Sequence, residues 1–325
     1  MGMVIDVILT YVLFVVGIYL LIKSADFIVD SSSSIAKKFG VSSLVIGLTV
    51  VAFGTSLPEL VVNVFAALGG SGGVSFGNII GSNIANVLLI LGITATIGGI
   101  VVKKKTVWKE VPFALLAAFA LFALSVKTFF GEGSKSLGIF EGSILLALFA
   151  TFMVYVFVSS KRERKGGAFV EDVDSHDWKV YAKLILGLVG IYFGGLWVVD
   201  GAVSIAGQLG LSEFLISATI IALGTSLPEL VVCVVAALKK NVDLAVGNVV
   251  GSNIFNILWV FGIIPFIRPI AIPKGIGFDL AVMFFATLAL FVIMFIGKKH
   301  EMSKRDGWIF ILFYVLYIAY IVMRG

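Results

Sequence analysis

Two acidic residues occur in identical surroundings, 170 positions apart. Glu59 closes the run Gly54-Thr55-Ser56-Leu57-Pro58-Glu59, and Glu229 closes the same run, which begins at Gly224. Each run joins one carboxylate to the hydroxyl groups of a threonine and a serine. Hard cations such as Ca²⁺ prefer oxygen ligands of this kind. The sequence therefore predicts two copies of one cation-binding element.

Each run also carries residues that interrupt a helix. Proline has no N–H to donate to the carbonyl four residues earlier, and glycine weakens the same turn. We expect the break to free the carbonyls of Gly54 and Gly224, and those of the preceding turn back to Ala52 and Ala222. Broken backbone is tolerated in a bilayer where it lines a cavity in the protein. These carbonyl oxygens then become further candidate ligands.

A second duplicated motif follows the first. It reads GNIIGSNIAN at residues 77–86 and GNVVGSNIFN at residues 247–256. In each copy a serine and an asparagine are four residues apart, Ser82 with Asn86 and Ser252 with Asn256. Residues at this spacing lie on one face of a helix. Each pair therefore presents a hydroxyl and an amide on one helix face, and the glycines of the motif permit close helix approach or a local break.

Soft-metal and enzymatic sites find no support in the sequence. Cys233 is the single cysteine, so neither an internal disulfide nor a thiolate cluster is available. His176 and His300 are both expected in loops, which disfavours zinc and copper. No Ser/His or Cys/His arrangement suggests a hydrolase. We expect neither an enzyme nor a bound cofactor.

The elements that position these residues are membrane spans. Hydrophobic residues make up 60% of the 325 positions, charged residues 13%, and the mean hydropathy is +1.12. A soluble domain needs roughly twice that charged fraction. The apolar residues form blocks of the length, about 20 residues, that a helix needs to cross a bilayer. The net charge of +5 lies in loops, so a nucleic-acid partner is not expected.

Hydropathy predicts an all-α membrane protein with ten transmembrane helices. The expected spans are residues 4–34, 42–68, 74–102, 107–129, 137–159, 180–208, 212–238, 244–266, 277–296 and 307–323. With the N-terminus outside, 18 Lys and Arg residues fall on the cytoplasmic side and 5 on the other. Because Lys and Arg are retained in cytoplasmic loops, both termini are predicted to be extracytoplasmic.

The chain matches itself when it is shifted by 170 residues. Between residues 41–93 and 211–263, 27 of 53 positions are identical without a gap. The repeat divides the chain into residues 1–160, a cytoplasmic connector at 161–178, and residues 179–325. Five spans per half is an odd number, so the two halves must be inverted, with broken helices meeting at the centre. Transporters with this architecture bind their ions near the midplane.

Both motifs in both halves resemble the sodium/calcium exchanger family of the Ca²⁺/cation antiporter superfamily, in its prokaryotic type. The resemblance covers essentially the whole chain. It implies that Glu59 and Glu229 are the principal Ca²⁺ ligands, and that the first and sixth helices slide against the other eight. The further ion ligands it implies are Thr55, Ser56, Thr225, Ser226, Ser82, Ser252, the carbonyls of Ala52 and Ala222, and the central Asn86 and Asn256.

Two departures from the family pattern stand out. Some relatives, including K⁺-dependent exchangers, carry aspartate where this chain has Asn256, so K⁺ co-transport is not expected. Many relatives carry serine four residues after each glutamate, where this chain has Asn63 and Cys233. The role of Asn63 stays open, and Cys233 is expected to serve packing.

The charge of the site predicts exchange. Two buried carboxylates without a counter-ion are unfavourable, so only a loaded site should change its access. One Ca²⁺ or several Na⁺ would neutralise the pair. The expected function is electrogenic, K⁺-independent exchange of Na⁺ for Ca²⁺ in the cell membrane, without an obligatory protein partner. A Ca²⁺/H⁺ exchanger of the same superfamily and a passive cation channel are the alternatives.

Overall fold

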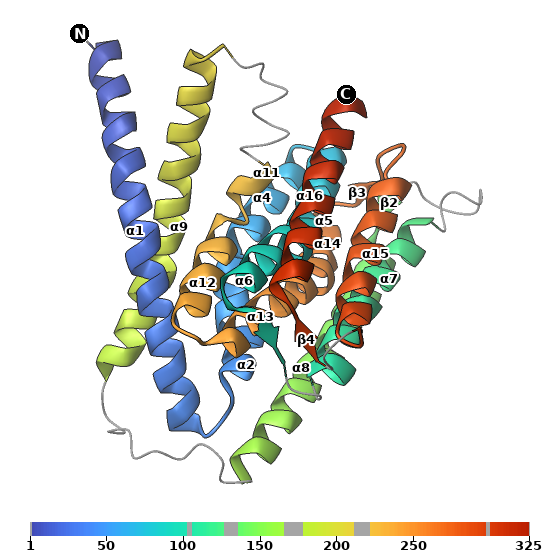
Figure 1. Cartoon of the computed structure of the whole chain (residues 1–325). Helices are drawn as coiled ribbons and strands as arrows, with labels where there is room; N and C mark the ends of the chain where they lie inside the picture. Colours follow the sequence, from blue (N-terminus) through green and yellow to red (C-terminus); the bar gives the residue numbers. More distant parts are fainter. Residues whose placement is uncertain are drawn as a thin grey trace.

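The computed structural model describes residues 2–102, 106–126, 136–165, 178–210, 222–296 and 300–324. Figure 1 shows helices throughout, with both termini at the same end of the molecule. The helices of the first half, with η marking π-helical segments, are α1 (Gly2–Phe39), α2 (Ser43–Ile46), η1 (Gly47–Val51), α3 (Ala52–Thr55), α4 (Leu57–Leu68), α5 (Gly72–Ile84), η2 (Ala85–Ile90), α6 (Leu91–Gly98), η3 (Thr106–Glu110), α7 (Val111–Val126) and α8 (Ile139–Lys165).

The second half repeats this order. Its described helices are α9 (Trp178–Gln208), α11 (Ala222–Gly224), α12 (Leu227–Leu238), α13 (Val242–Ile254), η5 (Phe255–Val260), α14 (Phe261–Ile267), α15 (Gly277–Ile293) and α16 (Lys304–Arg324). Four short strands complete the described chain: β1 (Ile100–Val101), β2 (Ser136–Leu137), β3 (Ile270–Ala271) and β4 (Glu301–Met302).

Helix length supports an all-α membrane protein. In the described residues, seven helices are long and apolar enough to cross a bilayer, and the bent pair Ser43–Thr55 and Leu57–Leu68 raises the number to eight. Leu227–Leu238 and Gly277–Ile293 are shorter apolar helices. The predicted span 212–238 falls partly on residues outside the described chain. Helices α1 and α8 extend beyond the apolar blocks predicted as the first and fifth spans, to Phe39 and Lys165.

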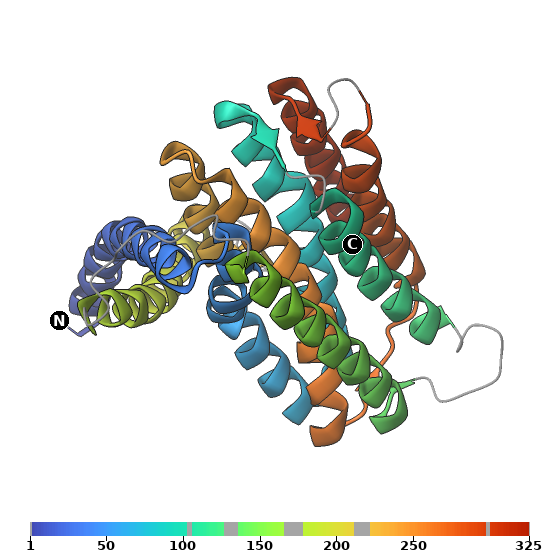
Figure 2. The same cartoon turned by 90° about the horizontal axis from the view of Figure 1, so that it is seen from below.

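The two longest helices, α1 and α9, pack against each other at one edge of the molecule (Figures 1 and 2). Glycines allow the close approach. A Cβ atom on Gly17 would lie 3.0 Å from the Gly194 carbonyl oxygen, and a Cβ on Gly194 would lie 3.0 Å from that of Gly17. Contacts of this kind join membrane helices through van der Waals packing. The pair is therefore a tightly packed unit beside the remaining helices.

The centre of the molecule is a crossing of one helix from each half. A Cβ on Gly47 would lie 2.7 Å from the Leu244 carbonyl oxygen, and a Cβ on Gly247 would lie 2.6 Å from that of Leu44. Backbone therefore meets backbone where η1 crosses α13. The span that contains α13 is 78% buried, against 33% for α1. This crossing carries the second motif of the second half.

Two short ribbons tie the halves together. β1 pairs with β4, and β2 pairs with β3, both antiparallel and both between the first and the second half. In Figure 1, β4 lies at the end opposite the termini, and β2 and β3 lie at the end that carries them. The ribbons therefore join the chain around α6, α7 and α8 of the first half to the chain around α14, α15 and α16 of the second.

Candidate functional site

The predicted helix break is confirmed in both halves. Helix α3 ends at Thr55, Ser56 has φ −86° and ψ 4°, and α4 begins at Leu57 after a bend of 41°. Ser226 has nearly the same conformation, with φ −87° and ψ 2°, before α12. In each half the proline is at the start of the new helix, where its missing N–H costs little. The break turns the neighbouring side chains toward the centre.

The predicted release of the Ala52 carbonyl is wrong. This carbonyl accepts a hydrogen bond from the Ser56 N–H at 3.0 Å and lies 3.4 Å from the Thr55 hydroxyl. Proline at position 58 removes only the donor whose acceptor would be Gly54, so the bond to Ala52 survives. In the second half the Ser226 N–H donates instead to the Leu223 carbonyl at 3.1 Å. The Ala222 carbonyl therefore does not receive the bond that Ala52 receives.

Both glutamates are fully buried, and each belongs to a helix that follows a break. Glu229 Oε1 lies 3.4 Å from the Ser56 hydroxyl and 3.2 Å from the Ser252 hydroxyl. Ser82 and Thr225 lie beside Glu59, but neither oxygen of Glu59 has a hydrogen-bond partner among the described residues. A buried carboxylate without partners is costly, unless a cation or a proton neutralises it.

The hydroxyl groups connect the two halves. Thr55 Oγ1 lies 3.3 Å from Ser252 Oγ, and Thr225 Oγ1 lies 3.3 Å from Ser82 Oγ. Each contact therefore joins the first motif of one half to the second motif of the other. The structure brings together seven of the predicted side chains in this way: Glu59, Glu229, Thr55, Thr225, Ser56, Ser82 and Ser252.

The central asparagines lie in π-helical segments that the sequence did not predict. Asn86 is in η2 and Asn256 is in η5, and both are fully buried. Asn86 donates from Nδ2 to Asn253 Oδ1 at 2.9 Å, and its own Oδ1 accepts nothing among the described residues. Neither polar atom of Asn256 has a partner in that part of the chain. Single-turn π-helical segments often occur at functional sites.

These oxygens fit a small cation. Among the predicted site residues, the buried side-chain oxygens without a hydrogen-bond partner in the described chain are Glu59 Oε1 and Oε2, Glu229 Oε2, Asn86 Oδ1, Asn256 Oδ1 and Ser226 Oγ. The described chain holds no group of three or more His, Cys, Asp or Glu side chains, so the donors are two carboxylates with neutral hydroxyl and amide oxygens. Such a mixed oxygen set suits Ca²⁺ and, with fewer charges per ion, Na⁺.

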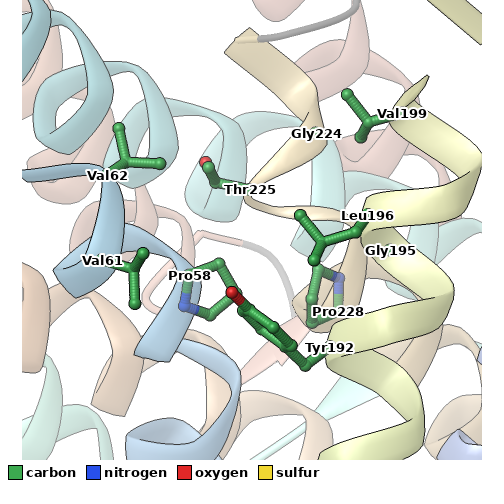
Figure 3. A pocket seen from close by; sticks show the side chains of 10 residues that line it. All are labelled: Pro58, Val61, Val62, Tyr192, Gly195, Leu196, Val199, Gly224, Thr225 and Pro228. Carbon is green, nitrogen blue, oxygen red and sulfur yellow. The ribbon is translucent and has the colours of Figure 1, made fainter. Parts of the chain in front are cut away.

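An apolar cavity of about 160 Å³ reaches the site from the side of α9. Figure 3 shows Pro58 and Val61 on one side of it, Pro228 and Leu196 on the other, and Tyr192 between the two prolines; Thr225 also lines it. The two prolines of the breaks therefore face the long helix α9 across a cavity rather than through direct polar contacts.

Sequence reasoning missed three asparagines. Thr55 Oγ1 donates to Asn248 Oδ1 at 3.0 Å, Thr225 Oγ1 donates to Asn78 Oδ1 at 3.1 Å, and Asn253 bonds Asn86. The signal was available, because Asn78 and Asn248 occupy the same place in the two copies of the second motif. Spacing along one helix could not show that their partners come from the other half.

Comparison with known proteins agrees with this arrangement. The family model described as sodium/calcium exchanger protein matches residues 9–158 and again residues 179–323. The putative antiporter CaxA of Alkalimonas amylolytica is 37% identical, and the match covers 93% of this chain and 95% of that protein. The sodium/calcium exchanger MaX1 of Methanosarcina acetivorans is 30% identical over 95% and 97% of the two chains.

Solved structures agree as well. The sodium-calcium exchanger NCX_Mj soaked with 2.5 mM Na⁺ and 10 mM Sr²⁺ has a TM-score of 0.81 and 33% identity, and the match covers 96% of this chain and 99% of that one. The same exchanger soaked with 10 mM Na⁺ and no Ca²⁺ has a TM-score of 0.82. With two matches of one family model, full-length relatives and a shared fold, this chain belongs to the sodium/calcium exchanger family.

Proposed function

We propose that this protein is an antiporter that exchanges Na⁺ for Ca²⁺ by alternating access. The observation that carries the proposal is the pair of fully buried glutamates, Glu59 and Glu229, each flanked by hydroxyl groups from both halves. Ionised residues inside a membrane are costly and mark ion pathways. The relatives named as sodium/calcium exchangers support Na⁺ and Ca²⁺ as the transported ions.

The proposed ligand set follows the predicted residues. Glu59 and Glu229 bind Ca²⁺, and the hydroxyl, amide and carbonyl oxygens complete the sites for Ca²⁺ and Na⁺. The further ligands are Thr55, Thr225, Ser56, Ser226, Ser82, Ser252, Asn86, Asn256, Ala52 and Ala222. For Ala52, the proposal uses the second lone pair of a carbonyl that already accepts one hydrogen bond.

Charge explains why transport is an exchange. The empty site holds two carboxylates in a medium of low dielectric constant, which opposes a change of access without ions. One Ca²⁺ neutralises the pair, and so do Na⁺ ions spread over neighbouring oxygens. If more than two Na⁺ move per Ca²⁺, each cycle carries net charge and responds to membrane voltage. The neutral amide of Asn256 adds no third charge, which favours K⁺-independent transport.

We further propose ten crossings in two inverted halves, residues 1–160 and 179–325, joined by a cytoplasmic connector at 161–178. Seven long helices, one bent pair and two shorter apolar helices support this number. The ribbons β1–β4 and β2–β3 use matching segments of the two halves at opposite ends, as an inverted repeat requires. The proposal places both termini on the extracytoplasmic side of the cell membrane. Residues 166–177 of the connector lie outside the described chain.

The deciding experiment is ⁴⁵Ca²⁺ uptake into proteoliposomes under separate Na⁺, K⁺ and H⁺ gradients. We expect an outward Na⁺ gradient to drive uptake, a K⁺ gradient to have no effect, and an imposed voltage to change the rate. Glu59→Gln and Glu229→Gln should each abolish uptake, because the amide removes charge without changing shape. Wild-type rates in either variant, or uptake without any counter-ion, would contradict the proposal.

Exchange for H⁺ is the second candidate. The specific observation that favours it is Glu59, whose two buried oxygens have no donor among the described residues and so could carry a proton. In the same experiment, uptake driven by a pH gradient without Na⁺ would identify this alternative.

A further inference from the structure

Asn78 and Asn248 each contact a threonine that is a candidate ligand, Thr225 and Thr55 respectively. Each is the first asparagine of a second motif, and each accepts the hydroxyl proton of a threonine that belongs to the other half. Asn248 is fully buried, and its Oδ1 lies 3.0 Å from Thr55 Oγ1. Asn78 Oδ1 lies 3.1 Å from Thr225 Oγ1 and 3.3 Å from Ser82 Oγ. The same contact therefore exists twice, once on each side of the site.

The direction of a hydroxyl proton decides whether that hydroxyl can bind a cation. A threonine hydroxyl has one proton and two lone pairs. A cation needs a lone pair, so the proton must point elsewhere. Beside an ionised carboxylate, the strongest competing acceptor is that carboxylate itself. An amide oxygen on the far side of the threonine holds the proton away from the site and leaves the lone pairs facing inward.

The amide of Asn248 is itself held in this orientation. Its Nδ2 donates to Cys233 Sγ at 3.5 Å, and Cys233 Sγ donates to the Ala245 carbonyl at 3.5 Å. Both residues are fully buried. Because the nitrogen of the amide faces the sulfur, the oxygen faces Thr55. A chain of donors therefore runs outward from Thr55 through Asn248 and Cys233 to the backbone.

The first half lacks this second support. Asn63 occupies the position that matches Cys233, but its Nδ2 donates to the Glu59 carbonyl of its own helix at 2.7 Å. Asn78 Nδ2 has no partner among the described residues. Asn78 is instead fixed by two hydroxyl donors, Thr225 and Ser82. In both halves an asparagine oxygen accepts the threonine proton. Cys233 holds the asparagine of the second half in place, whereas the hydroxyls of Thr225 and Ser82 hold that of the first.

We propose that Asn78 and Asn248 are positioning residues that turn the hydroxyl oxygens of Thr225 and Thr55 toward the transported cation, and that Cys233 braces Asn248. The inference rests on the proposed cation site and deepens it. It assigns a role to Cys233 beyond packing. It also predicts that the effect of Asn248 on cation binding passes entirely through the hydroxyl of Thr55.

The test is a double-mutant cycle on Ca²⁺ binding, measured by calorimetry with purified protein in detergent. Asn248→Ala removes the nearest acceptor of the Thr55 proton, which then turns to the Ser252 hydroxyl, the Ala52 carbonyl or Glu229, all of them proposed ligands. We expect Ca²⁺ affinity to fall about tenfold, as for a lost hydrogen bond at a charged site. Thr55→Val removes the hydroxyl and should lower affinity at least as much. Asn248→Ala added to Thr55→Val should then have no further effect. Additive losses would overturn the proposal.

Two variants of Cys233 provide an independent test. Cys233→Ala removes the acceptor for Asn248 Nδ2 and should weaken Ca²⁺ binding, whereas Cys233→Ser keeps both an acceptor and a donor and should restore it. Equal affinities for the two variants would overturn the bracing role. If Asn248→Ala does not fold, this pair and Thr55→Val still decide the proposal, because a purely structural role predicts loss of folded protein without the rescue by serine.

A matched control shows whether the loss of affinity comes from the site or from removing any buried hydroxyl group. Thr94 is fully buried and donates to the Ile90 carbonyl of its own helix at 2.7 Å, away from the motifs. Thr94→Val should leave Ca²⁺ affinity unchanged. If the wild-type protein binds no Ca²⁺, the proposed function itself fails. If the wild type binds Ca²⁺ and Asn248→Ala binds it equally well, only the positioning inference fails.

Discussion

Glu59 and Glu229 occupy matching positions, and hydroxyl groups from both halves lie beside each of them. Ser56 and Ser252 lie within hydrogen-bond distance of Glu229, and Ser82 and Thr225 lie beside Glu59. Hydrogen bonds to a carboxylate favour its charged form. Neutral hydroxyls supply only part of the compensation that two buried charges need, so both glutamates depend on a bound cation or proton for the rest.

Asn256 provides a test of the charge of the site. In Asn256→Asp a third carboxylate joins the two glutamates, so one Ca²⁺ no longer neutralises the site. We expect this variant to hold an additional proton or monovalent cation and to release more protons per bound Ca²⁺ than the wild type. Calorimetry in two buffers of different ionisation enthalpy measures the protons released. An unchanged proton count and unchanged effect of K⁺ would contradict the prediction.

Much of the site could be predicted from residues alone. The duplicated motifs identified the carboxylates, hydroxyls and amides, because identical polar runs in an apolar chain are hard to explain by packing. The partners of Thr55 and Thr225 could not be predicted, since they lie in the opposite half. The prediction of a free Ala52 carbonyl was wrong because the missing hydrogen bond lies two residues further along the chain. Pro58 removes the donor to the Gly54 carbonyl, and the Ser56 N–H keeps its bond to Ala52.

At the scale of elements, glycine determines how closely helices cross. The crossing of η1 with α13 leaves no room for a Cβ at Gly47 or Gly247, and a Cβ on Gly251 would lie 2.7 Å from that of Ala52. These close approaches pack η1 and α13 directly against each other at the centre of the molecule.

This close crossing predicts the cost of one substitution. In Gly247→Ala the new Cβ would lie 2.6 Å from the Leu44 carbonyl oxygen and force the backbones apart, so we expect the free energy of unfolding to fall by about 1–3 kcal/mol, the usual cost of overpacking. The variant should also bind Ca²⁺ more weakly, because Asn248 is the next residue. Gly195→Ala is the control, since its Cβ would lie at an ordinary contact distance, 3.9 Å, from Pro228 Cγ, and it should leave the melting temperature nearly unchanged. Equal losses in the two variants would contradict this account.

An ion-pair cluster links α1 to the end of α12. Lys239 Nζ lies 3.0 Å from Asp26 Oδ1 and 2.8 Å from Asp30 Oδ1, so these aspartates hold a lysine of the second half. Burial lowers the pKa of Lys239, but the hydrogen bonds and charges of Asp30 and Asp26 outweigh it and leave the pKa above its ordinary value of 10.5. Because folding raises the pKa of this base, the ion pairs contribute fully to the stability of the fold at pH values below the ordinary pKa. That contribution is lost as the pH rises through the raised pKa of the folded state. The pair therefore persists at physiological pH.

Removing this lysine should have a small effect on stability that depends on salt. Partly exposed ion pairs contribute about 0.2–1 kcal/mol, so Lys239→Met should lower the melting temperature by only a few degrees. The difference from wild type should shrink when choline chloride screens the charges; NaCl is unsuitable because Na⁺ is a proposed substrate. A difference that grows with choline chloride would contradict this account. Lys240→Met, one residue further, is the control.

The elements themselves were only partly predictable. Glycine and proline spacing correctly predicted the breaks before α4 and α12, because a missing donor has a local effect. The π-helical segments η2 and η5 have no such signature, since an extra residue in a turn depends on what packs against it. Hydropathy also does not show where a helix ends, because α1 and α8 continue through polar residues beyond their apolar blocks.

At the scale of the molecule, the candidate site is shared between the two halves. The contacts of Thr55 with Asn248 and of Thr225 with Asn78 cross between the halves, as do both ribbons and the packing of α1 on α9. Each half supplies one carboxylate and the acceptors for the other half's hydroxyls. The site is therefore a property of the assembled chain.

This division predicts reconstitution from two pieces. Residues 1–165 and 178–325, expressed together as separate chains, should copurify and gain thermal stability on addition of Ca²⁺. Either piece alone should show no such gain, since it has one glutamate and half of the hydroxyl network. Thermal unfolding with and without Ca²⁺ measures this. Stabilisation of a single piece by Ca²⁺ would refute the shared site.

The proposed orientation is also testable. In a Cys233→Ser background, a membrane-impermeant thiol reagent should label Ser71→Cys from outside the cell and Lys240→Cys only after the cytoplasmic face is opened. Both positions are exposed, in turns at opposite ends of the molecule. Labelling of Lys240→Cys in intact cells would reverse the proposed topology and place both termini inside.

The ribbons β1–β4 and β2–β3 have a consequence for how the two halves can diverge. Main-chain hydrogen bonds form whatever side chain a residue carries, so these ribbons constrain the sequence very little. Mutations can then accumulate separately in each copy without loosening the joint between them. The matching segments Ile100–Val101 and Ile270–Ala271 already differ at their second residue, and both are paired. The joint between the copies therefore survives divergence of the sequence that forms it.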